Sequence, residues 1–362
     1  MSWIRSLLCT AAAAAILIAP AARAAVPAVR SACAFNLPLN GPLCAQLGRS
    51  RELAEHSTWL AGVRGKTLVY ASEPLNSAVE VVALGGGGFT PVGSLSLSPG
   101  AVPLGLTVDA SQNLYVAAPA LGSGTQSVDV FRRGANKPSR VYTDGLTGPV
   151  DVAVDSQGTL YVANLAKPGG GCAQGSGPFG NIVEYAKGSM HPTGEIDNLP
   201  GCPEAVAVDA KDDVYLTYIY YPSNGLTGSN VLKYSSQTKK LRNLNLQAPG
   251  GNDFGGLAID RSGNLVLEND QADATVNQML IFAPGSKKPS ATVQYGGSGW
   301  GTSFRFFALL GTRFVAPAYV SENFPFVIST IATFDYPSGR ELHVQHREPA
   351  PAPFVYGFAV SP

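Results

Sequence analysis

Three oxygen-bearing side chains follow one another at Glu268, Asn269 and Asp270. Carboxylate and amide oxygens are hard ligands of the kind that Ca²⁺ and other divalent cations prefer. If the chain curls at this point, the three side chains can serve one cation, which could polarise a carbonyl group of a substrate. The segment is therefore a candidate metal site. Whether its side chains can bind one cation depends on the elements that position them.

Four further carboxylates recur about 50 residues apart, at Asp109, Asp155, Asp209 and Asp260. Each closes an apolar, strand-like run and precedes a turn, so each repeat holds one of them at a distance from the others. An Asp side chain in such a place accepts hydrogen bonds from turn amides. We therefore predict that these carboxylates stabilise turns and form no metal or acid–base site.

The repeat that carries these aspartates is a pair of short strands joined by a tight turn. Residues 149–164, PVDVAVDSQGTLYVAN, alternate apolar and polar residues on both sides of Gly158, which is typical of a hairpin of half-buried strands. Residues 103–118, 203–218 and 254–269 repeat the pattern. A second pair of strand-like runs follows each copy, and four antiparallel strands are the unit of a β-propeller blade.

Two less regular segments complete the count of blades. Residues 304–319 form a fifth, divergent copy, in which Leu310 and Gly311 replace the Asp turn. Val355 to Ser361 look like a first strand without its partner, and residues 64–74 look like a second strand without its first. Pairing these two segments removes free sheet edges and gives a blade of Val355 to Ser361 plus Lys66 to about Leu97.

The sequence therefore predicts an all-β fold, a six-bladed β-propeller of four-stranded antiparallel blades over residues 64–362. The C-terminal strand pairs with the N-terminal strands and closes the ring. Five blades is the alternative, if the divergent copy is only a connection.

The pattern G-L-x-x-P-x-x-V-A-V-D-x-x-G-x-L-Y-V-A-N in Gly145 to Asn164 resembles NHL-repeat propellers and the wider gluconolactonase-like superfamily. In gluconolactonase-like enzymes the channel mouth holds one divalent cation on Glu, Asn and Asp side chains. The resemblance implies Ca²⁺ or another divalent cation as the cofactor here, although the strand context differs from the family's metal motif. The residues that it brings forward are Glu73, Asn164, Asp253, Glu268, Asn269 and Asp270.

Loops at the strand ends opposite the Asp turns should converge on the central channel, where a propeller usually binds its ligand. Exposed Tyr and Trp residues there could stack on sugars or anchor a peptide. Packing between blades is the alternative interpretation of the aromatic residues. The candidates for this binding rim are Asp151, Glu204, Tyr218, Tyr220, Tyr221 and Trp300.

The four histidines are predicted to lie away from the channel mouth, in the N-terminal segment, an outer turn and an outer strand. A histidine base of the kind used by paraoxonases or streptogramin lyases therefore has no candidate in this chain. These residues are His56, His191, His343 and His346.

Residues 1–24 have the pattern of a signal peptide, with Arg5, an apolar run and a small-residue cleavage site. We expect an exported protein, periplasmic or secreted, in which residues 25–63 cap the ring. Without Cys9 the chain keeps an even number of cysteines for an oxidising compartment. We predict the disulfides Cys33–Cys44, which flank a Pro- and Gly-containing segment before the ring, and Cys172–Cys202, in two loops of one blade.

Composition limits the partners. Charged residues make up 14% of the chain, the formal net charge is zero, and Lys and Arg are scattered along the sequence, so nucleic acid is not an expected partner. No apolar run after the signal peptide is long enough for a membrane span. We expect a monomer whose partner is a protein, a glycan or a small molecule.

Two functions remain. In the first, the protein is an exported binding scaffold without its own catalysis, which the missing histidine base favours. In the second, it is a gluconolactonase-like hydrolase, a divalent-metal-dependent lactonase or a related enzyme, with an acidic site at the channel mouth. Bound metal would separate the two.

Overall fold

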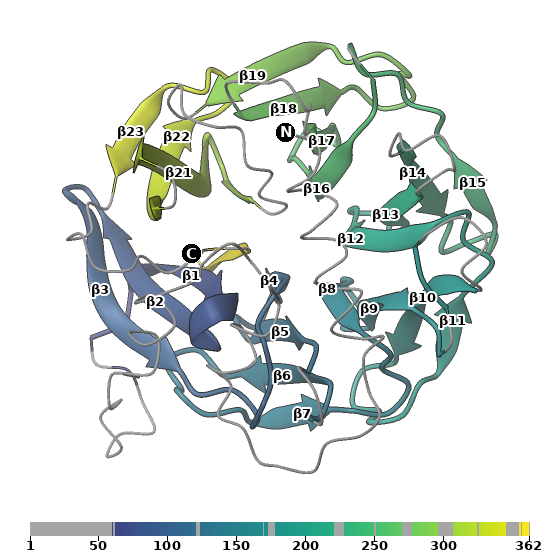
Figure 1. Ribbon diagram of the computed structural model, residues 1–362, viewed down its shortest axis with the longest axis horizontal. Helices are drawn as coiled ribbons and strands as arrows, with labels where there is room; N and C mark the ends of the chain where they lie inside the picture. Colours follow the sequence, from purple (N-terminus) through teal and green to yellow (C-terminus); the bar gives the residue numbers. More distant parts are fainter. Residues whose placement is uncertain are drawn as a thin grey trace.

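A computed structural model describes residues 60, 62–120, 124–168, 170–172, 178–220, 228–249, 251–269, 277–295, 307–323, 326–344, 355 and 357–361. These residues form six four-stranded antiparallel sheets. Figure 1 shows the sheets as blades around a central axis. The predicted six-bladed propeller is confirmed, and the five-bladed alternative is wrong.

The first three blades, from the innermost strand outwards, have the following strands. Blade 1 has β24 (Phe358–Ser361), β1 (Thr67–Glu73), β2 (Ala78–Gly85) and β3 (Gly88–Leu95); blade 2 has β4 (Leu106–Val108), β5 (Leu114–Ala118), β6 (Ser127–Phe131) and β7 (Arg140–Tyr142); blade 3 has β8 (Pro149–Val154), β9 (Leu160–Ala166), β10 (Phe179–Tyr185) and β11 (Gly194–Ile196). A single 3₁₀ turn in the described residues, η1 (Pro74–Asn76), joins β1 to β2.

The other three blades follow the same order. Blade 4 has β12 (Cys202–Val208), β13 (Val214–Tyr220), β14 (Gly228–Tyr234) and β15 (Leu241–Asn243); blade 5 has β16 (Phe254–Ile259), β17 (Leu265–Asn269), β18 (Asn277–Phe282) and β19 (Ala291–Tyr295); blade 6 has β20 (Ala308–Leu310), β21 (Arg313–Asn323), β22 (Phe326–Asp335) and β23 (Glu341–Val344). The divergent copy around Gly311 is therefore a complete blade.

The ring closes as predicted, by pairing segments from opposite ends of the chain. β24 lies antiparallel to β1, with Leu68 opposite Ser361 and Ala71 opposite Phe358. The Ser72 hydroxyl accepts a hydrogen bond from the Gly357 N–H at 2.7 Å. Blade 1 thus gains its innermost strand from the end of the described chain.

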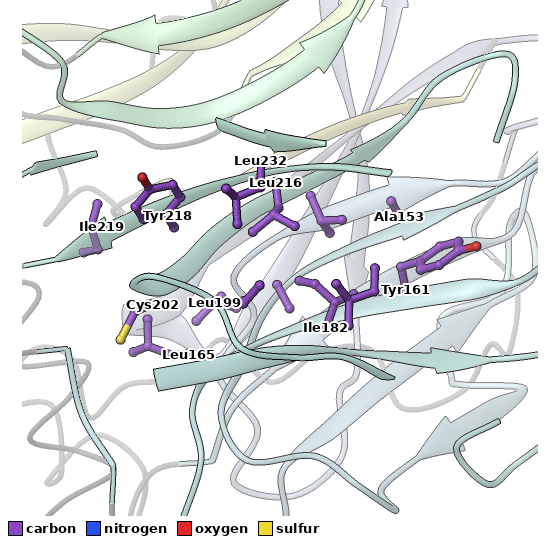
Figure 2. Packing of buried hydrophobic residues seen from close by; sticks show 14 of the residues in the cluster. Ala153, Tyr161, Leu165, Ile182, Leu199, Cys202, Leu216, Tyr218, Ile219 and Leu232 are labelled. Carbon is purple, nitrogen blue, oxygen red and sulfur yellow. The ribbon is translucent and has the colours of Figure 1, made fainter. Parts of the chain in front are cut away.

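The central strands are more buried than the alternating pattern indicated. In β8, Val150 and Val152 are buried as predicted, but Asp151 and Ala153 between them are buried as well. Neighbouring blades cover both faces of β8, whereas the innermost strands of blades 2 and 6, β4 and β20, keep partly exposed residues. Figure 2 shows one of these interfaces, where Leu165 and Ile182 of blade 3 lie close to Leu216 and Leu232 of blade 4.

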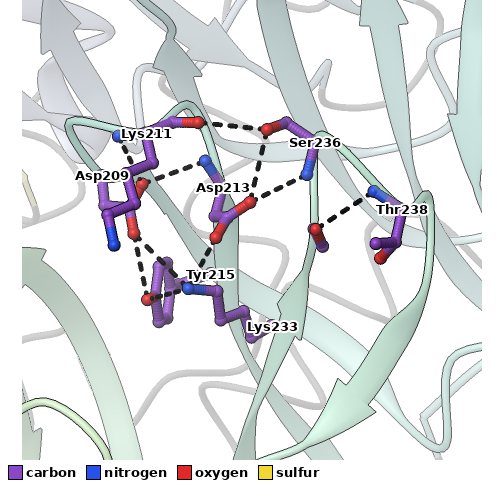
Figure 3. A network of polar contacts seen from close by, with 8 residues as sticks. Asp209, Lys211, Asp213, Tyr215, Lys233, Ser236 and Thr238 are labelled. Carbon is purple, nitrogen blue, oxygen red and sulfur yellow. Dashed lines mark hydrogen bonds and ion pairs between the residues drawn. The ribbon is translucent and has the colours of Figure 1, made fainter.

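The recurrent aspartates stabilise turns, as predicted. The Asp155 carboxylate accepts hydrogen bonds from the Gln157 and Thr159 amides at 2.9 and 2.7 Å, and from the Tyr161 hydroxyl at 3.2 Å. Figure 3 shows the same arrangement around Asp209, where the Lys233 ammonium also lies 3.6 Å from the carboxylate. These carboxylates are held by their own hairpins.

Candidate functional site

The ring has two chemically different sides, defined by the ends of the strands. The hairpin side carries the turns between first and second strands and those between third and fourth strands. The loop side carries the loops between second and third strands and the connections from blade to blade. Most of the candidate residues lie on the loop side, distributed over four blades: Glu73 in blade 1; Asp151 and Asn164 in blade 3; Glu204, Tyr218 and Tyr220 in blade 4; Asp253, Glu268 and Asn269 in or just before blade 5.

Three candidates fall outside the described residues, so their predicted roles stay predictions. They are Asp270, Tyr221 and Trp300.

Asn164 is a fully buried brace inside blade 3. Its side-chain oxygen accepts a hydrogen bond from the Thr147 amide at 3.0 Å. Its side-chain nitrogen donates to the Gly145 carbonyl at 3.1 Å and to the Asn181 side-chain oxygen at 3.0 Å. Asn164 therefore ties the connection that leads into β8 to the strand pair β9–β10.

Asn181 was missed by the sequence analysis. It is a buried amide in the third strand, β10, directly opposite Asn164 in the register. A polar residue within the run NIVEY was the available signal, and only the strand register shows which residue it faces.

Asp151 joins blade 3 to blade 4. It follows a β-bulge at the start of β8, and a bulge redirects the side chains next to it. One carboxyl oxygen accepts the Val206 amide of β12 at 2.8 Å. Burial raises the pKa of this carboxyl to about 8, and the hydrogen bonds from the Val206 and Val152 amides offset part of the rise. Asp151 is thus a buried inter-blade acceptor rather than a solvated acid.

Blade 4 joins to blade 5 through a hydroxyl that the sequence analysis also missed. Thr217 is fully buried; its hydroxyl accepts the Ala205 amide at 3.0 Å and donates to the Gly255 carbonyl at 2.9 Å. Glu204, buried at 3% exposure, lies at the bulge in β12 next to Ala205. The small Thr217 therefore links the first strands of blades 4 and 5, next to Glu204, for which the sequence predicted a place on the binding rim.

Two tyrosines mark the loop-side end of β13. Tyr218 is buried, and its hydroxyl accepts a hydrogen bond from the Asn243 side chain at 2.8 Å. Tyr220 is 39% exposed and lies nearly parallel to Tyr218, with ring centroids 6.5 Å apart. Packing between blades thus describes Tyr218, while Tyr220 presents a ring to solvent.

Blade 5 places Glu268 and Asn269 at the end of β17, with exposures of 3% and 2%. The Asn269 side-chain oxygen accepts the Asp253 amide at 3.1 Å. The Asn269 side-chain nitrogen is buried and has no hydrogen-bond partner within the part of the chain that the structure describes. Asn269 therefore keeps one buried donor that none of the described residues accepts.

Glu73 ends β1 and precedes the 3₁₀ turn. Its carboxylate accepts a hydrogen bond from the Asn76 side chain at 3.1 Å, and the residue is 7% exposed. Glu73 therefore holds the β1–β2 connection and lies in a different blade from Asn164 and Asn269.

The predicted Cys172–Cys202 disulfide is confirmed, with a Cα–Cα distance of 5.4 Å. It ties the loop between β9 and β10 to the first residue of β12 and so crosses from blade 3 to blade 4. The bond fits an oxidising, extracytoplasmic compartment. Cys33, Cys44 and the predicted signal peptide lie outside the described residues.

Among the described residues, no three His, Cys, Asp or Glu side chains come close enough together to hold a metal ion. The same residues include no helix with the length and apolar character of a membrane span.

Comparison with known proteins gives the fold alone. No family model and no curated protein matches the chain. A Bacteroides caccae protein of unknown function aligns with 82% of this chain and 99% of its own, at 8% identity and a TM-score of 0.54. A Lactobacillus plantarum protein aligns over the same shares, at 12% identity and a TM-score of 0.50.

A third solved structure, hydrazine synthase from Kuenenia stuttgartiensis, has a TM-score of 0.46 and 14% identity. The alignment covers 67% of this chain and 64% of that protein, so this chain spans less than two thirds of its length. The first two likenesses support the propeller architecture.

Proposed function

We propose that the protein is an exported, NHL-like β-propeller that binds a ligand on the loop side of its ring and has no catalysis of its own. The observation that carries this proposal is the buried side-chain nitrogen of Asn269, which has no acceptor among the described residues. A buried donor left without an acceptor costs about 1–3 kcal/mol. A ligand oxygen that accepts this hydrogen bond would remove the cost.

The polarity of this group favours a ligand oxygen over a cation. The side-chain oxygen of Asn269 already accepts the Asp253 amide, and the group left over is a donor. Sugar hydroxyls, carbonyls and carboxylates supply the matching acceptor. In the adjoining blade 4, the 39% exposed ring of Tyr220 offers a stacking surface of the kind that sugars use.

The experiment is a thermal-shift screen of the purified protein against neutral sugars, sugar acids and their lactones. A ligand that raises the unfolding temperature should do so much less in Asn269→Ala, because that variant lacks the side-chain donor. Gln157→Ala is the control, since it also removes a side-chain amide, from an exposed turn on the hairpin side. Equal shifts in all three proteins would place the ligand elsewhere and contradict the proposal.

A second candidate is the divalent-metal-dependent lactonase. It is favoured by the proximity of three oxygen-bearing side chains: Glu268 and Asn269 are neighbours at the end of β17, and the backbone amide of Asp253 bonds to Asn269. Metal analysis of the protein and of a variant with Glu268, Asn269 and Asp270 changed to Ala separates the two candidates. About one equivalent of Ca²⁺ or another divalent ion, lost in the variant together with lactone hydrolysis, would replace the scaffold proposal by the enzyme.

A further inference from the structure

Basic residues are scattered along the sequence but gathered in space. Among the described residues, every Lys and Arg lies in or next to the turns of the hairpin side, with the exception of Lys167 at the end of β9. All six blades contribute. Exposed examples in the outer hairpins are Lys137 in blade 2, Lys187 in blade 3, Lys287 in blade 5 and Arg340 in blade 6.

Contacts join neighbouring segments on the hairpin side, both within single blades and between blades 1 and 2. The aliphatic stem of Lys187, from an outer hairpin, lies over Gly158 in the inner hairpin of the same blade. The Ser236 hydroxyl in an outer hairpin donates to the Lys211 carbonyl in the inner one at 3.1 Å. Arg133 of blade 2 donates to the Lys66 carbonyl of blade 1. The cations of neighbouring turns therefore share one surface.

Carboxylates on this side are largely used by the turns themselves. Asp155 accepts turn amides, and Asp213 pairs with Lys233 at 2.7 Å and accepts the Ser236 amide at 2.9 Å. Asp335 accepts the Ser338 hydroxyl at 2.6 Å. These carboxylates are therefore already engaged by groups of their own blades.

We propose that the hairpin side binds a linear anionic glycan, a polysaccharide that carries a carboxylate or sulfate on its sugars. Lys is a compact, hydrated point charge on a flexible stem, so it suits many individually weak contacts along a chain. Cations spread over all six blades can follow such a chain across the surface, and the contacts add up.

Two other occupants are less well matched. A lipid surface usually needs apolar side chains that insert beside the charges. Met190 is the single large apolar side chain exposed among the described residues of the hairpin side. A second copy would have to offer the loop side as the anionic partner. Glu73, Asp151 and Glu268 there are buried, and the exposed Asp144 and Asp197 already contact His191 and Lys167, respectively.

This inference goes beyond the proposed function, because it concerns the opposite side of the ring. The test measures binding of the purified protein to polygalacturonate and to dextran sulfate, with neutral dextran as the control polymer. We expect binding to at least one of the charged polymers, none to dextran, and an affinity that falls at least about tenfold between 50 and 200 mM salt as counterions are displaced.

A pair of charge-matched variants locates the site. Lys137→Gln, Lys187→Gln and Lys287→Gln together remove three charges from the hairpin side, and we expect them to weaken binding more than about tenfold. Lys167→Gln, Thr125→Glu and Asn198→Asp change the net charge equally on the loop side and should bind nearly as the parent does. Equal losses in both variants would overturn the assignment to the hairpin side.

The remaining outcomes also decide the proposal. Binding to vesicles containing phosphatidylglycerol, without binding to either polymer, would overturn it in favour of a membrane surface. Salt-sensitive self-association that the hairpin-side variant abolishes, again without polymer binding, would overturn it in favour of a second copy. No binding to any of these probes would also overturn it, and would leave the loop-side ligand proposal untouched.

Discussion

Blades 3 and 5 bury the same kinds of polar group in the same place and use them differently. Asn164 and Asn269 occupy equivalent positions in their blades. Each lies towards the loop-side end of a second strand, four residues after its first residue, which is Leu160 in β9 and Leu265 in β17. Both accept a backbone amide from the connection before their blade. Only Asn164 also uses its side-chain nitrogen.

The buried carboxylates differ in the same way. Blade 3 places Asp151 on β8 opposite the small Ala163, whereas blade 5 has Gly256 on β16 and Glu268 on β17 at the corresponding positions. Asp151 accepts an amide of the next blade. The difference teaches that one repeat position can serve as a brace in one blade and as a candidate binding group in another.

In blade 3 the largest expected effect is that of Gly180→Ala, which disturbs the pairing of β9 with β10 next to Asn164. A Cβ atom here would lie 1.7 Å from the Asn164 carbonyl and 2.6 Å from that of Leu165, both rigid backbone atoms. We expect a loss of about 3 kcal/mol or more in the free energy of unfolding. Chemical denaturation measures it, with Gly86→Ala as a control because nothing lies within 4 Å of the added atom there. A loss below that of the control would show that β9 and β10 adjust freely.

Next comes the disulfide, which blade 5 lacks among its described residues. Changing Cys172 and Cys202 to Ser opens a loop of sequence separation 30. The chain-entropy model predicts a loss of about 3–4 kcal/mol in the free energy of unfolding. Thermal melts of the variant, and of the parent protein with and without reductant, check this value. A reduced parent as stable as the oxidised one would mean that the bond constrains little.

The direct comparison is Asn164→Ala against Asn269→Ala. Asn164 loses three hydrogen bonds, and we expect a cost of about 2–4 kcal/mol. Asn269 loses one bond together with its unsatisfied donor, so we expect a cost of about 1 kcal/mol or less. Denaturation of both variants in the absence of ligand gives the difference. Equal costs would remove the distinction between the two blades.

The last prediction concerns Asp151 and the pH dependence of stability. An unfolded Asp titrates near pH 4, so between about pH 4 and pH 8 the folded protein holds a proton that the unfolded chain has lost. The free energy of unfolding therefore falls as pH rises through this interval, by on the order of 1 kcal/mol per pH unit, and levels off above it. Asp151→Asn should lose most of this decline, because the side-chain amide of Asn does not titrate. Its oxygen can still accept the hydrogen bond from the Val206 amide, so the contact itself is kept.

Burial also raises the pKa of Glu184, which leaves a smaller residual slope in the variant. Denaturation curves at pH 5, 6.5 and 8 are the measurement. An identical pH slope in the parent and in Asp151→Asn would show that Asp151 is ionised in the folded protein across this range.

The architecture was predictable because it depends on local, repeated signals. The alternating strands around Gly158, the turn aspartates and the complementary terminal segments each report on a few neighbouring residues, and together they gave all six blades and the closing strand. The Cys172–Cys202 pair was predicted correctly, although the bond crosses from blade 3 to blade 4 instead of joining two loops of one blade.

The site was less predictable because its groups depend on register and on neighbouring blades. The sequence placed Asn164 on the correct side of the ring, but its partner Asn181 is identified only by strand pairing. The link from Thr217 to Gly255 depends on how two blades abut. Likewise, lysines that are far apart in the sequence reach one side of the ring because hairpins of different blades point the same way.

The closing strand has a consequence for the order of events during synthesis. Ser72 and Gly357, which hydrogen-bond across β1 and the segment leading into β24, are 285 residues apart. At typical translation rates that distance takes roughly 15 to 60 seconds to synthesise. Throughout that interval the inner edge of β1 has no strand to pair with, and an unpaired edge is a site for association with other chains. A nascent chain of this protein would therefore be most exposed to aggregation, and most dependent on chaperones, until residues 358–361 emerge.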